Sequence, residues 1–311
     1  MPELPEVEVV RAGLEPAVVG ARIASVSVFE SRSLRRHEGP SEDFIERLEG
    51  RSIEAAVRRG KFLWLPLSGS VDEPEALVVH LGMSGQVLLR SLDQPDDSLL
   101  RIRLGLVTPS PDSGHRDLRA ELIRLDFVDQ RIFGSMAIDR LVPTDDGRAA
   151  GLGSELALIP SQVAHIARDP LDPAFDDGRF FAALAKRKTG IKRALLDQNL
   201  ISGIGNIYAD ESLWASRIHY DQPTNTLSRA RAKTLLAEVR IVLRKALAEG
   251  GTSFDAQYVN VNGASGYFSH SLNAYGQHGE ACPRCGRPIV RDQFMNRGSH
   301  YCPFCQRLRT T

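Results

Sequence analysis

The sequence of 311 residues has few cysteines and no long apolar run. All four cysteines lie in the last 30 residues, which excludes a small scaffold stapled by disulfides along its length. No segment approaches the roughly 18 consecutive apolar residues of a membrane span. The opening MPELPEVEVV contains two prolines and three glutamates and resembles no part of an export signal. We therefore expect a globular protein that is not exported.

Net charge is also absent, because 39 Lys and Arg balance 39 Asp and Glu. The two halves of the chain nevertheless differ in sign. Residues 1–177 contain 20 basic and 30 acidic side chains (20 − 30 = −10), whereas residues 178–311 contain 19 and 9 (19 − 9 = +10). A basic half favours a polyanion such as nucleic acid as partner, although a chance excess of solvated basic side chains is the alternative.

Hydrophobic periodicity divides the chain into a β-rich part and a helical part. Residues 22–141 contain short alternating segments broken by polar turns, which predicts an all-β sandwich or barrel. A helix that ends at Gly20 is expected before them, because apolar residues recur at three- and four-residue steps. These residues are Val7, Val10, Leu14 and Val18.

Beyond residue 173 the pattern predicts four helices. One of them would begin with Thr189 as its N-cap, and the last would run from Ser228 to Glu249 before a Gly-Gly pair. The stretch before them is rich in Asp, Gly, Ala and Pro and is expected to be a linker. The predicted boundaries are 1–142 for the leading helix and β domain, 143–173 for the linker, 174–270 for the helical domain and 271–311 for the tail.

The four cysteines form two C-x2-C knuckles, Cys282 with Cys285 and Cys302 with Cys305, separated by sixteen residues. This spacing is typical of a tetrahedral Zn–S4 site. Two disulfides are the alternative, which a chain without an export signal disfavours. Because four thiolates fill the coordination shell, we expect one structural Zn²⁺.

Between the knuckles, Asn296-Arg297-Gly298-Ser299 predicts the tight turn of a β-hairpin, since Asn and Gly favour turns. Such a turn would present Arg297 outward. A guanidinium group held in this way suits a phosphate, and a plain solvated arginine is the alternative.

Removal of the initiator methionine would leave Pro2 with a free secondary amine. An α-amino group titrates near pH ~8, so a part of it is unprotonated and nucleophilic at neutral pH. Its addition to a sugar C1′ gives an iminium ion, an electron sink that permits elimination. Glu3 and Glu6 would supply proton transfers beside it, although an acidic first turn also simply complements a helix dipole.

The segment Gly203-Ile204-Gly205-Asn206 joins two predicted helices. Its glycines allow close backbone approach, and the amides of the helix start, together with the side chain of Asn206, are typical of a phosphate site. Lys192 and Arg193 on the preceding helix would add positive charge. A plain helix–turn–helix joint is the alternative.

Seven motifs occur in a fixed order along the whole chain: MPELPEVE, RRGKFLW, HLGMSG, DQRIFG, LLDQNLISGIGNIYADE, YVNVNGASGYF and the C-x2-C-x16-C-x2-C tail. With them the chain resembles the formamidopyrimidine-DNA glycosylases, the Fpg/Nei family of helix-two-turn-helix DNA-repair enzymes. The resemblance implies an α+β multidomain fold, with an N-terminal antiparallel β-sandwich, a leading helix, a C-terminal helix-two-turn-helix domain and a zinc-finger β-hairpin. DNA would bind between the two main parts, and a loop over 252–268 would cover the lesion.

The resemblance implies a bifunctional DNA glycosylase/AP lyase of base excision repair, which excises 8-oxoguanine and formamidopyrimidines from duplex DNA. Pro2 would displace the damaged base and form a Schiff base. Glu3 would be the general acid/base that assists opening of the sugar ring, and Glu6 a second acidic residue of the pocket.

Other residues match the family's DNA contacts. Lys61 resembles its lysine near the lesion and the phosphate. Asn206 and Arg297 resemble its phosphate clamp, with His80 and Tyr275 assisting.

Met83, Arg131 and Phe133 match the trio that fills the gap left by the extruded nucleotide. Many relatives have Pro and Arg where this chain has Gln130 and Ile132, so the resemblance covers the trio but not the detailed shape of that loop.

The implied partner is double-stranded DNA with oxidised purines or abasic sites, bound by a monomer in the bacterial cytoplasm, at the nucleoid. The PELPEV opening and the long loop favour the branch for oxidised purines over the sister branch for oxidised pyrimidines. Two interpretations outside these enzymes stay open: a non-catalytic zinc-hairpin DNA-binding protein, and a small-molecule isomerase with an N-terminal proline.

Overall fold

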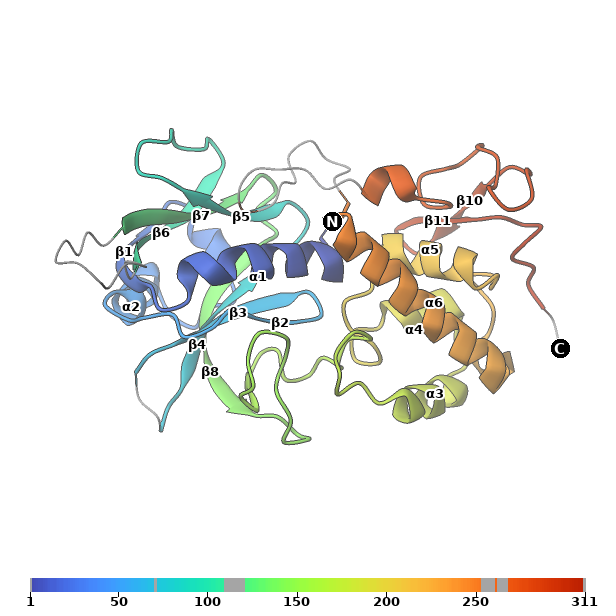
Figure 1. Cartoon of the computed structure of the whole chain (residues 1–311), viewed down its shortest axis with the longest axis horizontal. Helices are drawn as coiled ribbons and strands as arrows, with labels where there is room; N and C mark the ends of the chain where they lie inside the picture. The colour runs from blue at the N-terminus through green and yellow to red at the C-terminus, as the bar shows by residue number, and fades with distance from the viewer. Residues whose placement is uncertain (1, 70–71, 109–120, 253–260, 262–267, 310–311) are drawn as a thin grey trace, which may run out of the picture. The chain divides into compact units, whose positions relative to one another are not determined.

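The computed structural model describes residues 2–69, 72–108, 121–252, 261 and 268–309 (Figure 1). These residues form two compact units, which are described separately. Unit 1 contains Pro2, residues 6–165 and Val261, and unit 2 contains residues 3–5, 166–252 and 268–309. Within this part of the chain, no helix is long and apolar enough to cross a membrane.

Unit 1 is built on two antiparallel sheets, with strand orders β1-β6-β7-β5 and β2-β3-β4-β8-β9. Its strands are β1 (Arg22–Val28), β2 (Val57–Arg59), β3 (Phe62–Leu67), β4 (Glu75–His80), β5 (Gly85–Arg90), β6 (Leu100–Thr108), β7 (Glu121–Asp129), β8 (Ser135–Pro143) and β9 (Leu158–Pro160). Its helices are most of α1 (Leu4–Val18), η1 (Ser31–Leu34) and α2 (Ser41–Leu48).

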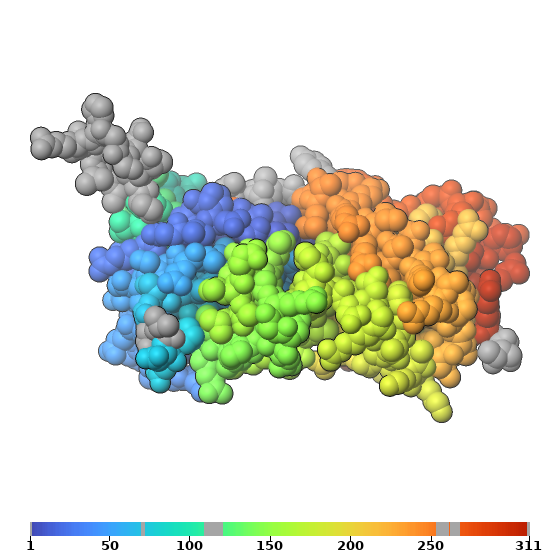
Figure 2. Space-filling view, turned by 60° about the horizontal axis from the view of Figure 1, so that its bottom comes forward, coloured from blue at the N-terminus to red at the C-terminus, as the bar shows by residue number. Residues whose placement is uncertain are grey.

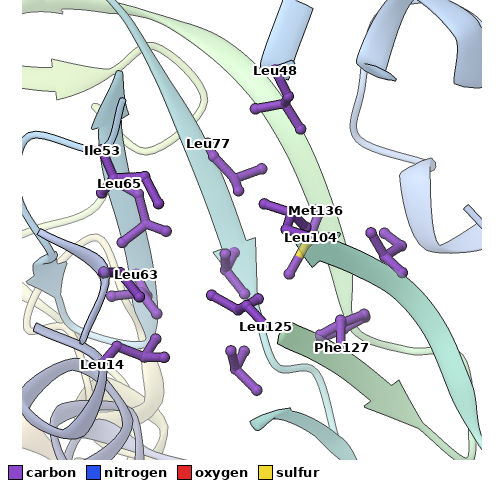
Figure 3. Packing of buried hydrophobic residues seen from close by; sticks show 14 of the residues in the cluster. Leu14, Leu48, Ile53, Leu63, Leu65, Leu77, Leu104, Leu125, Phe127 and Met136 are labelled. Atoms are coloured by element: carbon purple, nitrogen blue, oxygen red, sulfur yellow. The ribbon is translucent and has the colours of Figure 1, made fainter. Parts of the chain in front are cut away.

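One apolar core takes side chains from both sheets and from α1 and α2 (Figure 3). Leu65 and Leu77 come from one sheet, Leu104 and Leu125 from the other, and Leu14 from α1. The alternating pattern places these residues inward, so the predicted antiparallel β-sandwich is confirmed. In β1 the register shifts between Ile23 and Ser25, which lets Ile23 and Val26 both face the core.

Helix α1 follows the predicted spacing. Its inward side chains, Val7, Val10, Leu14 and Val18, are at most 1% exposed, and Gly20 follows it in the left-handed region at φ +82°. Leu4, the first residue of the helix, packs in the core of unit 2. The expected linker over 143–173 is partly a piece of unit 1, because β9 pairs with β8.

Unit 2 contains the four predicted helices, α3 (Asp177–Lys186), α4 (Ile191–Leu196), α5 (Asn206–Ala215) and α6 (Arg229–Ala248). It also contains η2 (Thr224–Thr226), η3 (Phe268–Ser271) and the antiparallel hairpin of β10 (Val290–Phe294) and β11 (Arg297–Tyr301). Helix α6 agrees with the expected range of 228–249 to within one residue at each end, and the side chain of Ser228 caps it by accepting the N–H of Arg231. The outer side of α6, orange in Figure 2, exposes Arg229, Lys233, Arg244 and Lys245.

Two local predictions are wrong. Thr189 does not cap α4: the helix begins after Gly190, and its first amides donate instead to the carbonyls of Gln222 and Tyr220. The hairpin turn is Met295-Asn296, because Phe294 pairs with Arg297 and the three residues after Arg297 lie within β11.

Truncation of Leu14 to Ala should lower the free energy of unfolding of unit 1 by about 3 kcal/mol, because the side chain is fully buried and leaves a cavity. Urea unfolding followed by the fluorescence of Trp64, the tryptophan of unit 1, measures the change. Val19→Ala is the control, since Val19 is 40% exposed. An equal effect of the two substitutions would contradict the assigned core.

Candidate active site

The carboxylate of Glu3 caps the N-terminus of α5. Its Oε2 accepts the N–H of Gly205 at 2.5 Å and that of Tyr208 at 3.4 Å, and its Oε1 accepts the N–H of Ile207 at 3.0 Å. These donors and the positive end of the helix dipole stabilise a negative charge at this position. The prediction that the amides of this helix start bind a phosphate is wrong here, because a carboxylate of the chain itself occupies them.

Both glycines of the turn before α5 allow this approach. A Cβ on Gly205 would lie 2.3 Å from Cδ of Glu3, and one on Gly203 would lie 2.8 Å from Cβ of Leu4. The carbonyl of Gly203, which has φ +89°, accepts the N–H of Leu4 at 2.9 Å. The glycines therefore serve close backbone approach, as the sequence predicts, but to the start of the chain.

The other two residues expected in the reaction are also buried. Pro2 directly precedes the fixed Glu3, so the nitrogen of an N-terminal Pro2 would belong to the residue next to that carboxylate. Glu6 lies in the first turn of α1 and is 1% exposed.

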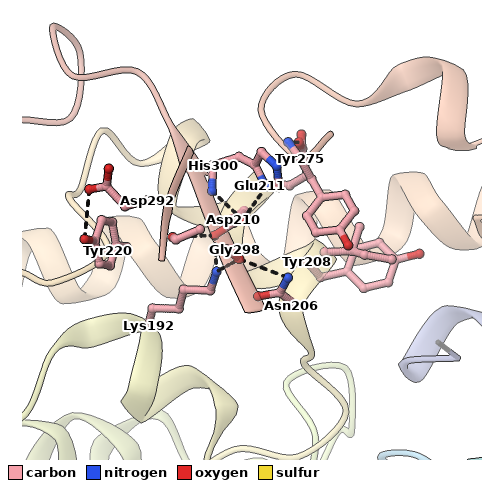
Figure 4. A network of polar contacts seen from close by, with 12 residues as sticks. Lys192, Asn206, Tyr208, Asp210, Glu211, Tyr220, Tyr275, Asp292, Gly298 and His300 are labelled. Carbon is pink, nitrogen blue, oxygen red and sulfur yellow. Dashed lines mark hydrogen bonds and ion pairs between the residues drawn. The ribbon is translucent and has the colours of Figure 1, made fainter. Parts of the chain in front are cut away.

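Arg297 begins β11 and has an exposed side chain, as expected. The carbonyl of the next residue, Gly298, accepts hydrogen bonds from Lys192 Nζ and from Asn206 Nδ2, both at 3.2 Å (Figure 4). Burial raises the pKa of the Tyr275 phenol, and the side chain of Asn206 acts in the opposite direction. The structure thus gathers Asn206, Tyr275 and the residue after Arg297.

Lys192 does not add surface charge, contrary to expectation. Its side chain is fully buried and forms an ion pair with Asp210 at 2.6 Å. Burial lowers the pKa of Lys192, while the carboxylates of Asp210 and Glu3 act in the opposite direction. Arg193, the neighbouring residue, is exposed.

Sequence reasoning missed Glu211. Its buried carboxylate accepts the main-chain N–H groups of Asn273, Ala274 and Tyr275 at 2.8–3.1 Å, which holds Tyr275 in place. Burial raises the pKa of Glu211, and these hydrogen bonds oppose that effect. No sequence signal marks this role, because the partners lie more than 60 residues away.

In unit 1, Met83, Arg131 and Phe133 lie on two adjoining turns and are all exposed. Asp129 joins the turns: its carboxylate accepts Ser84 Oγ at 2.5 Å, the N–H of Arg131 at 3.1 Å and the N–H of Gly134 at 2.6 Å. The turns also touch directly, since a Cβ on Gly82 would lie 2.3 Å from the carbonyl carbon of Phe133.

Arg35 is a second residue that sequence reasoning missed. Its guanidinium donates to the carbonyls of Ile132, Phe133 and Gly134. Ile132 has φ +54°, a conformation that β-branched residues rarely adopt. Arg35 and Asp129 therefore hold a strained turn.

Lys61 and His80 lie at neighbouring positions of one sheet. Lys61 is in the two-residue turn between β2 and β3, and the next residue, Phe62, pairs with His80 on β4. Burial, followed by the positive charges of Arg36, Lys61 and Arg35, lowers the pKa of His80 to about 4. His80 Nδ1 accepts the N–H of Gly82 at 3.2 Å, so a neutral His80 presents Nε2–H as a donor.

The four cysteines form the expected zinc site. Their sulfur atoms all lie within 4.8 Å of one another, close enough to share one tetrahedral ion. The indole N–H of Trp214 points to Cys282 Sγ at 3.4 Å, which suits a thiolate acceptor. Cys282, Cys285, Cys302 and Cys305 thus fit one structural Zn²⁺, and all four positions of its shell are filled by the chain.

The expected lesion-covering loop over 252–268 lies largely outside the described residues, which include only Thr252, Val261 and Phe268 of it.

Three family models match the chain in order. The formamidopyrimidine-DNA glycosylase N-terminal domain matches residues 1–136, the H2TH domain of the same glycosylase matches residues 166–257, and a zinc finger found in FPG and IleRS matches residues 279–308.

Two similar proteins carry the name formamidopyrimidine-DNA glycosylase. That of Leifsonia xyli subsp. xyli (strain CTCB07) is 64% identical over 308 residues, which cover 99% of this chain and 100% of that protein. That of Thermobifida fusca (strain YX) is 55% identical over 306 residues, which cover 98% and 97%.

Solved structures of Lactococcus lactis Fpg are similar at 30% identity. The complex with abasic-site DNA has a TM-score of 0.77 over 98% of this chain and 99% of that chain. The complex of the wild-type protein with N7-benzyl-Fapy-dG DNA has a TM-score of 0.78 over 98% and 100%.

Gly82→Ala should destabilise unit 1 by about 2 kcal/mol more than Gly147→Ala. Both glycines have nearly the same positive φ, +62° and +63°, so both variants carry the left-handed strain of about 1–2 kcal/mol. Only at Gly82 does the new Cβ meet backbone atoms, whereas nothing lies within 4 Å at Gly147. Urea unfolding followed through Trp64 measures both changes, and equal values would contradict the contact between the two turns.

The His80 environment predicts a loss of stability in acid. An unfolded histidine takes up a proton near pH 6.5, whereas folded His80 does so near pH 4, so the free energy of unfolding falls as pH drops below 6.5. Between pH 7 and pH 5 this group should contribute a loss of about 2 kcal/mol. Wild-type protein should lose that much more than His80→Asn, which keeps an acceptor for the Gly82 N–H. Parallel pH profiles for the two proteins would contradict the low pKa.

Proposed function

The chain belongs to the formamidopyrimidine-DNA glycosylase family, and we propose that Pro2 and Glu3 carry its reaction. The chain is a bifunctional DNA glycosylase and AP lyase that acts on oxidised purines in base excision repair. The observation that supports the assignment to these residues is the capping of α5 by Glu3. It fixes one carboxylate directly beside the residue whose amine would react.

The proposed reaction begins when the Pro2 nitrogen forms a bond to C1′ and the bond from C1′ to the damaged base breaks. Glu3 gives a proton to the sugar ring oxygen as the ring opens, which leaves an iminium ion between Pro2 and C1′. Loss of a proton from C2′ then expels the 3′ phosphate, and a second elimination expels the 5′ phosphate. The N–H proton that Pro2 loses balances the proton that the departing base takes up, and the iminium ion is the electron sink for both eliminations. Water finally hydrolyses the iminium, which frees Pro2 and the unsaturated sugar fragment and leaves a one-nucleotide gap with phosphate ends.

We propose that Arg297, Asn206 and Lys61 contact the DNA backbone near the lesion, with Tyr275 and His80 assisting. Arg297 is exposed at the start of a strand whose next residue, Gly298, is bonded by Lys192 and Asn206, which suits charge-assisted hydrogen bonds to a phosphate. A neutral His80 would contribute a hydrogen bond rather than a charge.

We propose that Met83, Arg131 and Phe133 fill the gap left by the extruded nucleotide. Exposed apolar side chains on turns fixed by Asp129 and Arg35 can replace lost stacking, and Arg131 can hydrogen-bond the unpaired base.

We further propose that one chain suffices for the reaction and that it works in the bacterial cytoplasm, at the nucleoid. All residues proposed for the reaction and for the zinc site come from the same chain, and the similar proteins come from bacteria.

Borohydride should trap a covalent adduct between the protein and a duplex that contains 8-oxoguanine. Pro2→Ala should abolish most of the adduct, and Glu3→Gln should slow its formation by about 100-fold, because positioned acid/base groups contribute factors of this size. Glu15→Gln, on the exposed side of the same helix, is the control and should react like wild type. Mass spectrometry of the sample verifies that Met1 is absent.

Two outcomes would contradict the assignment. One is an undiminished adduct in protein that retains Met1, because the Pro2 amine would then be blocked. The other is faster reaction on a duplex with thymine glycol than on one with 8-oxoguanine, which would place the chain with enzymes for oxidised pyrimidines.

A further inference from the structure

Asp210, in the middle of α5, is only 1% exposed, and its carboxylate makes four contacts with three residues. Its Oδ1 lies 2.6 Å from Lys192 Nζ and accepts Ser299 Oγ at 3.1 Å. Its Oδ2 accepts the main-chain N–H of His300 at 2.8 Å and lies 3.3 Å from His300 Nδ1. The carboxylate thus connects α4, α5 and β11 (Figure 4).

The buried ion pair is a poor source of net stability. Taking both charges out of water costs several kcal/mol, and apolar residues of similar volume often stabilise a fold equally well. A carboxylate fixed by four contacts does, however, define one arrangement of the segments that it joins. The arrangement that it defines here is the position of β11 on α5.

Residues 298–300, which follow Arg297 in β11, are each hydrogen-bonded to a side chain of α4 or α5. Gly298 is bonded by Lys192 and Asn206, and Ser299 and His300 are bonded by Asp210. Asn206 and Asp210 are four residues apart on α5, so they lie on the same side of the helix. Adjacent Cα atoms are 3.8 Å apart, so fixing residues 298–300 also restricts where Arg297 begins.

We propose that Asp210 is the positioning residue for Arg297: it fixes β11 on α5 so that the exposed guanidinium meets the DNA phosphate. This inference rests on the proposed phosphate contact of Arg297. The same helix α5 also binds Glu3, the proposed acid/base residue, at its N-terminus, so one helix positions both Glu3 and the strand that begins with Arg297. The role belongs to a residue that need not touch DNA.

Two double variants test the proposal, since both remove the buried charges together and leave no unpaired ion. Lys192→Met/Asp210→Asn keeps an acceptor at position 210 for the His300 N–H. In Lys192→Met/Asp210→Ser, the shorter side chain at position 210 is not expected to reach the His300 N–H on β11. The two proteins therefore differ only in the contact to the strand, and thermal melting and zinc content verify that each is folded.

The measurement is the dissociation constant for a duplex with a stable abasic-site analogue between 50 and 300 mM salt. Loss of one phosphate contact lowers the slope of log K against log salt by about 0.9. Arg297→Ala and the Ser double variant should both show this loss, with about ten-fold weaker binding at low salt. The Asn double variant should keep the wild-type slope. Asp292→Asn, on the same hairpin but bonded to the Tyr220 and Tyr301 hydroxyls, should keep it as well.

Combination with Arg297→Ala separates positioning from general damage. In that background the Ser double variant should weaken binding no further. If it weakens binding equally with and without Arg297, or if it keeps the wild-type slope, the proposal is overturned. Should it not fold, Ser299→Ala replaces it, with about two-fold weaker binding that must vanish in the Arg297→Ala background.

An unchanged slope for Arg297→Ala would overturn the phosphate contact and the positioning role together. Borohydride trapping through Pro2 does not depend on either, so the proposed reaction is judged independently.

Discussion

The capping of α5 by Glu3 is the interaction on which the proposed site depends. Three main-chain amides and a helix dipole hold one carboxylate, and Gly205 lets it approach because a Cβ would collide with it. A chain terminus is ordinarily the least ordered part of a fold. Here the contact fixes the third residue, so the amine proposed as nucleophile has only one residue through which to move. The fold thereby orients the amine of Pro2, and such orientation of a reacting group is a large part of catalysis by proximity.

Helix α5 has no solvent face along most of its length, and four of its polar residues attach it to three other segments. Asn206 and Asp210 bind β11, Glu211 binds the main chain before Tyr275, and Trp214 points its indole N–H at the zinc site. Buried polar groups cost stability unless they have partners, and the carboxylates of Asp210 and Glu211 are each met by several donors. The helix therefore relates Glu3, the phosphate-contact residues and the zinc site within one unit, through directional bonds rather than apolar contacts, which tolerate sliding.

What the sequence reveals follows from the range of the interactions involved. The spacing of Val7, Val10 and Leu14, the helical period over 228–249 and the cysteine knuckles are local patterns, and the structure confirms the helices and the zinc site that they predict. Lys192, Asp210 and Glu211 look like solvated helix charges, because their partners in β11 and before Tyr275 lie 62–106 residues away. Gly298 illustrates an ambiguity: glycine marks turns but also close approach, and here a Cβ would lie 2.3 Å from Nε of Arg291. The nucleophilic role of Pro2 and the phosphate contacts of Arg297 and Asn206 also follow from the chemistry of those residues, whereas the roles of Lys61, His80 and the turn residues of unit 1 come from family resemblance alone.

Charge counted along the sequence overstates the basic surface of unit 2. Lys192 is buried against Asp210, and Arg240 is paired with Asp177, so neither is available to a phosphate in the way that the exposed Arg193, Arg244 or Arg297 is. The two turns of unit 1 expose the apolar side chains of Met83 and Phe133 with Arg131 as their one exposed cation, and His80 beside them is neutral at pH 7. Electrostatic attraction to DNA, which salt screens, is thus assigned chiefly to unit 2, whereas stacking in place of the extruded base, which salt hardly affects, is assigned to unit 1. This division means that a substitution in the turns of unit 1 can impair extrusion of a base without altering how strongly binding responds to salt.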